Sequence, residues 1–83
     1  MVIKYFSWIK EHIGKSEEEI FLPDKITDID QLINYLIEID EKYSLIYEKK
    51  EIIKIAVNKT YSSFDTNISN SDEIAFFPPV TGG

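Results

Sequence analysis

The residues best suited to carry chemistry in this 83-residue chain are the last six, Pro-Pro-Val-Thr-Gly-Gly. Pro78 and Pro79 have a fixed φ and no amide N–H, so they cannot continue a β-ladder and they favour an extended chain. Gly82 and Gly83 have no side chains, so their backbone can pass through a channel too narrow for any other residue. The pattern predicts a folded domain over residues 1–77 and an extended, flexible tail over residues 78–83.

The rest of the composition excludes most catalytic and metal sites. There is no cysteine, which rules out disulfides, thiolate zinc sites and cysteine nucleophiles, and His12 alone cannot form a histidine metal cluster or a catalytic triad. No glycine-rich phosphate-binding loop is present, so ATP is expected to bind elsewhere. The run Glu17–Glu19 is expected to be a solvated cluster, because neighbours in sequence seldom converge on one ion. We expect no resident metal, no bound cofactor and no catalysis by the chain alone.

The charge balance favours a protein partner over nucleic acid. Nine lysines, no arginine and fifteen acidic residues give a net charge of −6. Such a surface repels phosphate backbones and lacks the side chain best suited to bidentate phosphate contacts, whereas a basic protein surface would be attracted to it. No apolar run approaches the roughly 20 residues of a membrane span, and the first residues do not follow the pattern of a secretion signal. We therefore expect a cytoplasmic protein that binds neither nucleic acid nor membranes.

Side-chain alternation predicts the strands that must position the tail. In residues 1–6, Ile3 and Tyr5 share a face expected to meet the core. Pro23 is expected to stop a second strand, antiparallel to the first, and Asn58-Lys59 is expected to form a turn between two later strands. The expected strands are residues 1–6, 19–22, 53–58, 60–61 and 73–77.

Helical spacing predicts one main helix and one short one. Four apolar residues share a stripe at i, i+3, i+4 and i+7, namely Ile29, Leu32, Ile33 and Leu36. Thr27 and Asp30 have the spacing of a capping pair at the start of this helix. Ser7 is expected to cap a short helical turn that ends at Gly14. One main helix packed on one face of a mixed sheet is an α+β roll.

Two aromatic residues fall on faces where alternation places charged side chains. Phe6 shares a face with Lys4, and Phe77 shares a face with Glu73. If the first and last strands are neighbours, the two rings form one apolar patch at the root of the tail. Exposed patches of this kind often mark interfaces, and we predict that Phe6 and Phe77 contact a partner.

Several segments resemble one known family. They are Val2–Phe6, Ala56–Asn58, Ser63–Asp65 and above all Asp72–Gly83, which contains Ala-Phe-Phe-Pro-Pro-Val-Thr-Gly-Gly. In order and without large gaps, they are similar to the small, ubiquitin-like subunits of molybdopterin synthases. Lys10 stands where members often carry arginine, and Trp8 is unusually bulky. The resemblance covers essentially the whole chain and implies a ubiquitin-like β-grasp roll.

The resemblance also implies a sulfur carrier with three protein partners. An E1-like activating enzyme would use ATP to adenylate the Gly83 carboxylate, and a sulfur donor protein would convert it to a thiocarboxylate. The tail would enter the large catalytic subunit, within a heterotetramer, and pass sulfur to cyclic pyranopterin monophosphate during molybdenum cofactor biosynthesis. Lys10 would contact an anionic group on a partner. The residues expected to thread through the large subunit are Pro78, Pro79, Val80, Thr81 and Gly82.

Three other functions share parts of this pattern. A sulfur carrier for thiamine synthesis or tRNA thiolation would also end in Gly-Gly, although the Phe-Phe-Pro-Pro-Val-Thr lead-in argues against it. A ubiquitin-like modifier would form the same acyl adenylate and then join Gly83 to lysines of target proteins. A simple interaction domain would carry an inert tail.

Overall fold

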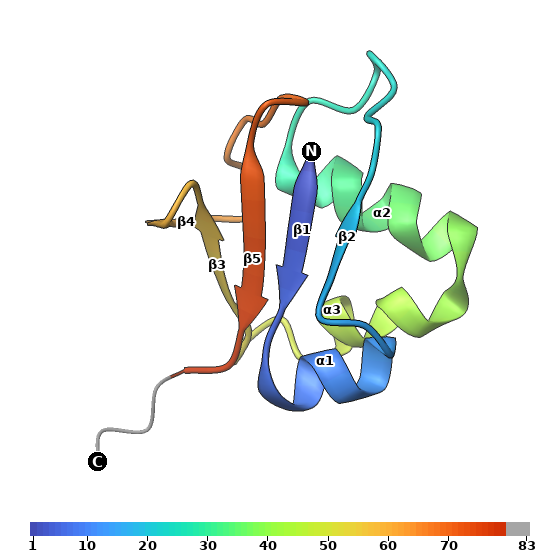
Figure 1. The fold of residues 1–83 in the computed structure, drawn as a ribbon, viewed down its shortest axis with the longest axis vertical. Coiled ribbons are helices and arrows are strands. Elements are labelled where there is room, and N and C mark those ends of the chain that lie inside the picture. The colour runs from blue at the N-terminus through green and yellow to red at the C-terminus, as the bar shows by residue number, and fades with distance from the viewer. Residues whose placement is uncertain (80–83) are drawn as a thin grey trace.

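The fold comes from a computed structural model that describes residues 1–79. Its elements in chain order are β1 (Val2–Tyr5), α1 (Ser7–Ile13), β2 (Glu17–Glu19), α2 (Ile29–Ile39), the 3-10 helix η1 (Glu41–Ser44), α3 (Leu45–Glu48), β3 (Lys54–Val57), β4 (Thr60–Ser62) and β5 (Glu73–Phe77). The strands form one mixed sheet in the order β2-β1-β5-β3-β4. Only β1 and β5 pair in parallel, and they lie side by side in the middle of the sheet (Figure 1).

The core lies between α2 and one face of this sheet. On the inner face, Ile3 and Tyr5 of β1 lie beside Ile74 and Phe76 of β5, and all four side chains are buried. The predicted stripe of α2 is fully buried as well. The core faces predicted for the first strand and for the main helix are therefore confirmed, because an alternation of two and a period of 3.6 each place one apolar side inward.

The later strands also agree with the prediction. The structure has β3 within residues 53–58, β4 over residues 60–62 and β5 over the predicted residues 73–77. Asn58 and Lys59 join β3 to β4 with φ angles of 50° and 68°. Two consecutive residues at positive φ are typical of the tight hairpin turns whose twist matches the flanking strands.

A second strand antiparallel to the first is present as predicted, but its bounds were predicted too far along the chain. The structure pairs β1 with Glu17–Glu19, which shares only Glu19 with the predicted residues 19–22. Leu22 is buried, but its backbone is held by the Asn70 side chain: its N–H donates to Asn70 Oδ1 at 2.7 Å and its carbonyl accepts from Asn70 Nδ2 at 3.2 Å. An apolar residue near a proline therefore marked a loop anchored to the core, and not the strand itself.

Both predicted helix caps need correction. The N-cap of α1 is Phe6, without a side-chain hydrogen bond, and Ser7 is already inside the helix. The N-cap of α2 is Asp28, whose carboxylate accepts from Gln31 N–H at 2.8 Å. Gln31 Oε1 in turn accepts from Thr27 N–H at 2.7 Å. The capping pair is thus shifted by one residue from the predicted Thr27 and Asp30, because Asp28 has the extended backbone that a cap needs.

Glu18 joins three elements through one carboxylate. Its Oε2 accepts the hydroxyl hydrogens of Tyr5 and Tyr43, each at 2.6 Å, and its Oε1 accepts from Lys15 Nζ at 3.1 Å. The prediction that the acidic run is simply solvated is therefore wrong for Glu18. Burial and the nearby carboxylate raise the pKa values of both tyrosines, so that their hydroxyls stay protonated as donors. Because Tyr5 also stacks on Phe76, with ring centroids 6.1 Å apart, this carboxylate connects the β2 edge to the core.

Gly14 ends α1 at the predicted position. Its φ is 90°, and its N–H donates to the carbonyl of Lys10 at 2.8 Å. A Cβ added there would meet no atom within 4 Å, so only backbone strain opposes a larger residue. We expect Gly14→Ala to lower the free energy of unfolding by about 1 kcal/mol, measured by urea denaturation. Glu11→Ala, on the exposed side of the same helix, is the matched control; an equal loss in both variants would contradict this explanation.

Within residues 1–79, none of the helices has the length and apolar character that crossing a membrane requires.

Candidate functional site

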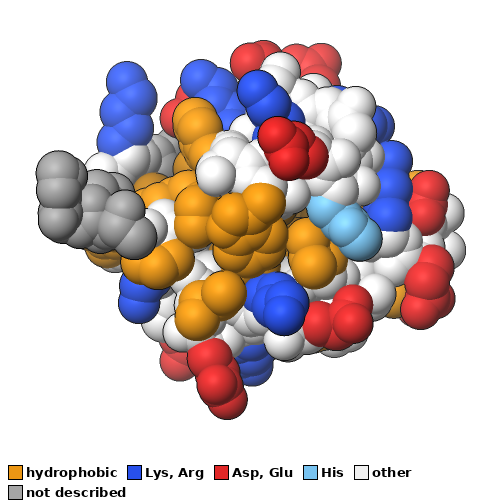
Figure 2. All heavy atoms as spheres, turned by 90° about the horizontal axis from the view of Figure 1, so that it is seen from below, with side chains coloured by type: hydrophobic (Ala, Val, Ile, Leu, Met, Phe, Trp, Pro, Cys, Tyr) orange, Lys and Arg blue, Asp and Glu red, His pale blue; other side chains and the backbone are white. Residues whose placement is uncertain are grey.

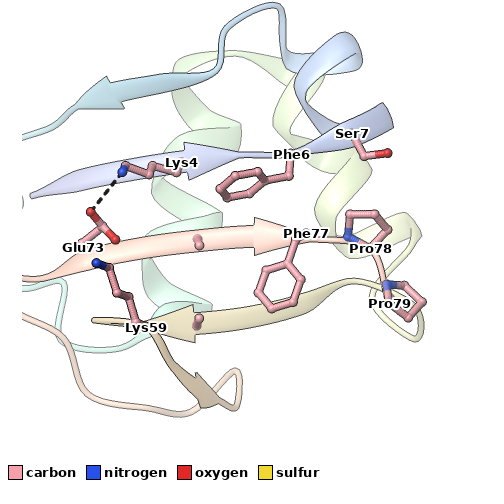
Figure 3. A pocket seen from close by; sticks show the side chains of 10 residues that line it. Lys4, Phe6, Ser7, Lys59, Glu73, Phe77, Pro78 and Pro79 are labelled. Carbon is pink, nitrogen blue, oxygen red and sulfur yellow. Dashed lines mark ion pairs between the residues drawn. The ribbon is translucent and has the colours of Figure 1, made fainter. Parts of the chain in front are cut away.

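The outer face of the sheet contains a shallow hollow of about 620 Å³ at the end where β1 and β5 finish. Phe6 comes from the end of β1 and Phe77 from the end of β5, and Pro78 and Pro79 continue the lining directly after the last strand (Figure 3). The predicted apolar patch at the root of the tail is therefore present. Figure 2, which looks at this end of the molecule, shows hydrophobic side chains gathered together and charged side chains around them.

The backbone of Phe6 is held from both sides. Its N–H donates to the carbonyl of Phe76 at 3.2 Å, and its own carbonyl accepts from Ile9 N–H at 3.2 Å, in the first turn of α1. Ser7, the next residue, has a φ of 56°, an uncommon value for a residue other than glycine. The chain therefore turns sharply from β1 into α1, and the Phe6 side chain is left 46% exposed on the outer face.

Phe77 is half-buried, and the cover comes partly from another aromatic residue. The rings of Phe77 and Tyr61 have centroids 5.7 Å apart and are inclined by 52°. Tyr61 itself is 73% exposed, so the two rings extend the apolar surface toward β4. Sequence reasoning missed Tyr61. The signal was available: a two-residue turn places Tyr61 opposite Ala56, on the face away from the buried Ile55.

Two of the remaining predicted site residues, Pro78 and Pro79, also line this hollow, whereas Lys10 does not. Lys10 is exposed on α1 and borders a separate, smaller hollow with Lys15 and Ser16, so its contact with a partner stays a prediction. Pro78 is half-buried and Pro79 is exposed. The other predicted tail residues, Val80, Thr81, Gly82 and Gly83, lie outside the described residues. In the part of the chain that is described, no three His, Cys, Asp or Glu side chains come together as a metal site.

Comparison with known protein families matches residues 3–83 to the ThiS family. The chain belongs to the ThiS family. One relative, from Haemophilus influenzae, is 35% identical over 98% of this chain and 96% of its own length, and it is named molybdopterin synthase sulfur carrier subunit. The family resemblance seen in the tail and strands is therefore confirmed over nearly the whole chain.

Several solved structures have the same fold as this ThiS-family chain. SAMP1 from Haloferax volcanii matches with a TM-score of 0.79 and 22% identity, covering 100% of this chain and 98% of that one. A chain from a structure of the complex of subunits 1 and 2 of molybdopterin-converting factor from Helicobacter pylori matches with a TM-score of 0.63 and 23% identity. The match covers 99% of this chain and 96% of that one. The predicted fold class, a ubiquitin-like β-grasp with a mixed sheet, is confirmed.

Proposed function

We propose that this ThiS-family chain is the sulfur carrier subunit of a molybdopterin synthase. The observation that carries the proposal is the full-length similarity to a curated carrier subunit of that name, together with a family match that runs through residue 83. The Phe6–Phe77 hollow at the root of the tail supports it, since it supplies a surface on which a partner can hold the domain while the last residues react.

The chemistry of such a carrier resides in the Gly83 carboxylate. A carboxylate is a poor electrophile, and forming a mixed anhydride with AMP gives it a good leaving group. Attack by sulfide on the carbonyl carbon then forms a C–S bond, breaks the C–O bond to AMP and leaves a thiocarboxylate. In this proposal ATP is bound by an activating enzyme, and the carrier contributes proximity, because its docked domain holds the reactive end close to the acceptor.

The proposed partners are an adenylating enzyme, a sulfur donor protein and the large subunit of the synthase, all in the cytoplasm. The Helicobacter pylori structure is titled as a complex of subunits 1 and 2 of molybdopterin-converting factor, which supports the large subunit as a partner. We propose that Phe6 and Phe77 dock against that subunit, and that residues 78–83 extend into it.

The test is an intact mass spectrum after incubation with ATP, the activating enzyme of the same organism and a sulfide source. The proposal expects a mass increase equal to replacing one oxygen by sulfur, mapped to Gly83 and absent in a chain that lacks Gly83. Adding the large subunit and cyclic pyranopterin monophosphate should then yield molybdopterin. An unchanged mass, with an activating enzyme that modifies another carrier, would refute the carrier function. Sulfur transfer to a thiamine or tRNA pathway, or conjugates with target lysines, would favour the other functions.

A further inference from the structure

The hollow has two chemically different ends. Phe6, Phe77 and the two prolines form the apolar end beside the tail, whereas Lys4, Lys59 and Glu73 form the opposite end (Figure 3). Lys4 Nζ lies 3.4 Å from Glu73 Oε1 and is therefore neutralised by it. Among residues 1–79, no carboxylate lies within ion-pair distance of Lys59. The three charged side chains that line this end thus sum to +1, in a protein whose net charge is −6.

The position of Lys59 at this rim is set by its turn. Asn58 forms three hydrogen bonds with residues at the start of β5. Its N–H donates to Glu73 O at 2.8 Å and its Oδ1 accepts from Glu73 N–H at 2.9 Å. Its Nδ2 donates to Asp72 Oδ1 at 2.8 Å. Lys59 follows directly, with a φ of 68°. Because the β3–β4 turn is tied to the central strand, the root of the Lys59 side chain has a fixed place relative to Phe77.

Small side chains line the hollow between its two ends. Ala56 of β3 and Ala75 of β5 are paired in register, and both line the hollow. Two methyl groups and two phenyl rings leave room for a bulky apolar side chain from a partner. A carboxylate near that side chain would come close to Lys59, where its charge would be complementary.

We propose that Lys59 is a specificity-determining contact: the hollow takes a segment of the large subunit that presents a bulky apolar side chain near a carboxylate. The apolar group lies between Phe6 and Phe77, and the carboxylate lies on Lys59. The inference rests on the proposed function, because it names the chemistry of that partner surface. A segment without the carboxylate would still fill the apolar end but would lose attraction to the cationic end.

The test measures the affinity of the full chain for the large subunit of the same organism by calorimetry, at low and at high salt. We expect Lys59→Gln to weaken binding about fivefold and Lys59→Glu at least about tenfold at low salt. Both losses should shrink at high salt, because screening weakens exposed charge pairs. Lys25→Gln, an exposed lysine that borders a different hollow beside α2, is the matched control and should bind like the unchanged chain.

Two results would overturn the inference. One is unchanged affinity in both Lys59 variants, and the other is an equal loss in Lys25→Gln, which would reflect net charge and not a contact. The sulfur-for-oxygen mass change at Gly83 is measured in the same variants. If that change occurs while Lys59 has no effect on binding, the inference fails and the carrier function stands. If the unchanged chain binds no large subunit, the inference and that partner both fail.

Discussion

Phe77→Asp is expected to weaken the complex with the large subunit at least about 100-fold and to leave the domain folded. Phe77 lies at the root of the tail and contributes one wall of the hollow. A carboxylate there would remove an aromatic anchor, leave the Tyr61 ring without its partner, and bring a desolvated charge to an apolar contact. Because the side chain faces outward and is not in the core, the cost should fall on binding. Calorimetry measures the affinity, and circular dichroism monitors the fold.

Phe21→Asp is the matched control for this result. Phe21 is the same residue type and is 79% exposed, but it lies in the loop after β2 and does not line the hollow. Its substitution should change the affinity less than about threefold, as expected for a residue outside an interface. Equal losses in the two variants, or full binding by Phe77→Asp, would show that the partner docks on another surface.

Glu18→Ala is expected to destabilise the domain by about 2–4 kcal/mol. The substitution leaves the hydroxyls of Tyr5 and Tyr43 without the acceptor that both use, and Tyr5 is buried in the core. A buried polar group that loses its partner costs the free energy of desolvation in full. Urea denaturation measures the loss. Glu17→Ala, an exposed residue of the same strand, should change the free energy of unfolding by less than about 0.5 kcal/mol.

The same carboxylate predicts how stability depends on pH. Burial alone would raise the pKa of Glu18, but hydrogen bonds from Tyr43, Tyr5 and Lys15 outweigh it and hold the pKa below its usual value of 4.5. A carboxyl with a depressed pKa in the folded state contributes stability above its unfolded pKa and loses that contribution as the pH falls through the folded value. Glu18→Gln should therefore lose less stability than the unchanged chain as the pH falls from above 4.5 through the lowered pKa of the folded state. Parallel curves for the two proteins would contradict this.

The parts of the fold that sequence predicted well are those with a strong apolar period. Ile3 and Tyr5 alternate with outward-facing residues, and the apolar stripe of α2 repeats at helical spacing. In each element the apolar period therefore predicts both the type of secondary structure and the buried face. The bounds of β2 were predicted wrongly because its sequence is Glu-Glu-Glu, which has neither alternation nor high strand propensity. Its inward residue, Glu18, is determined by pairing with Ile3, a contact between distant parts of the chain.

The segment between α2 and β3 was left without structure for a related reason. η1 and α3 span only four residues each, which is too short for a helical period to be recognised. Tyr43 and Ile46 are nevertheless buried there. The place of Tyr43 follows from the contact of η1 with α2 and from its hydrogen bond to Glu18, and the place of Ile46 follows from the contact of α3 with α1. Local sequence does not encode these contacts.

The candidate site was predictable in part. Alternation alone placed Phe6 and Phe77 outward, and the assumption that the first and last strands are neighbours brought them together, as the structure shows. The turn predicts which face Tyr61 shares within the β3–β4 hairpin, but it does not predict that Tyr61 and Lys59 join the surface of Phe6 and Phe77, because that depends on the register of β3 against β5. Whether Phe6 and Phe77 bind the large subunit stays a prediction.

The central position of β5 has a consequence for how the protein folds. The pairing of β1 with β5 joins Val2 to Glu73, so the middle of the sheet forms only when the two ends of the domain meet. Contacts so distant along the chain slow folding, because most of the loop entropy is lost before they form. A chain that stops before Glu73 would lack the whole central strand. Such a chain should fail to form the sheet, because β1 and β3 both pair with β5.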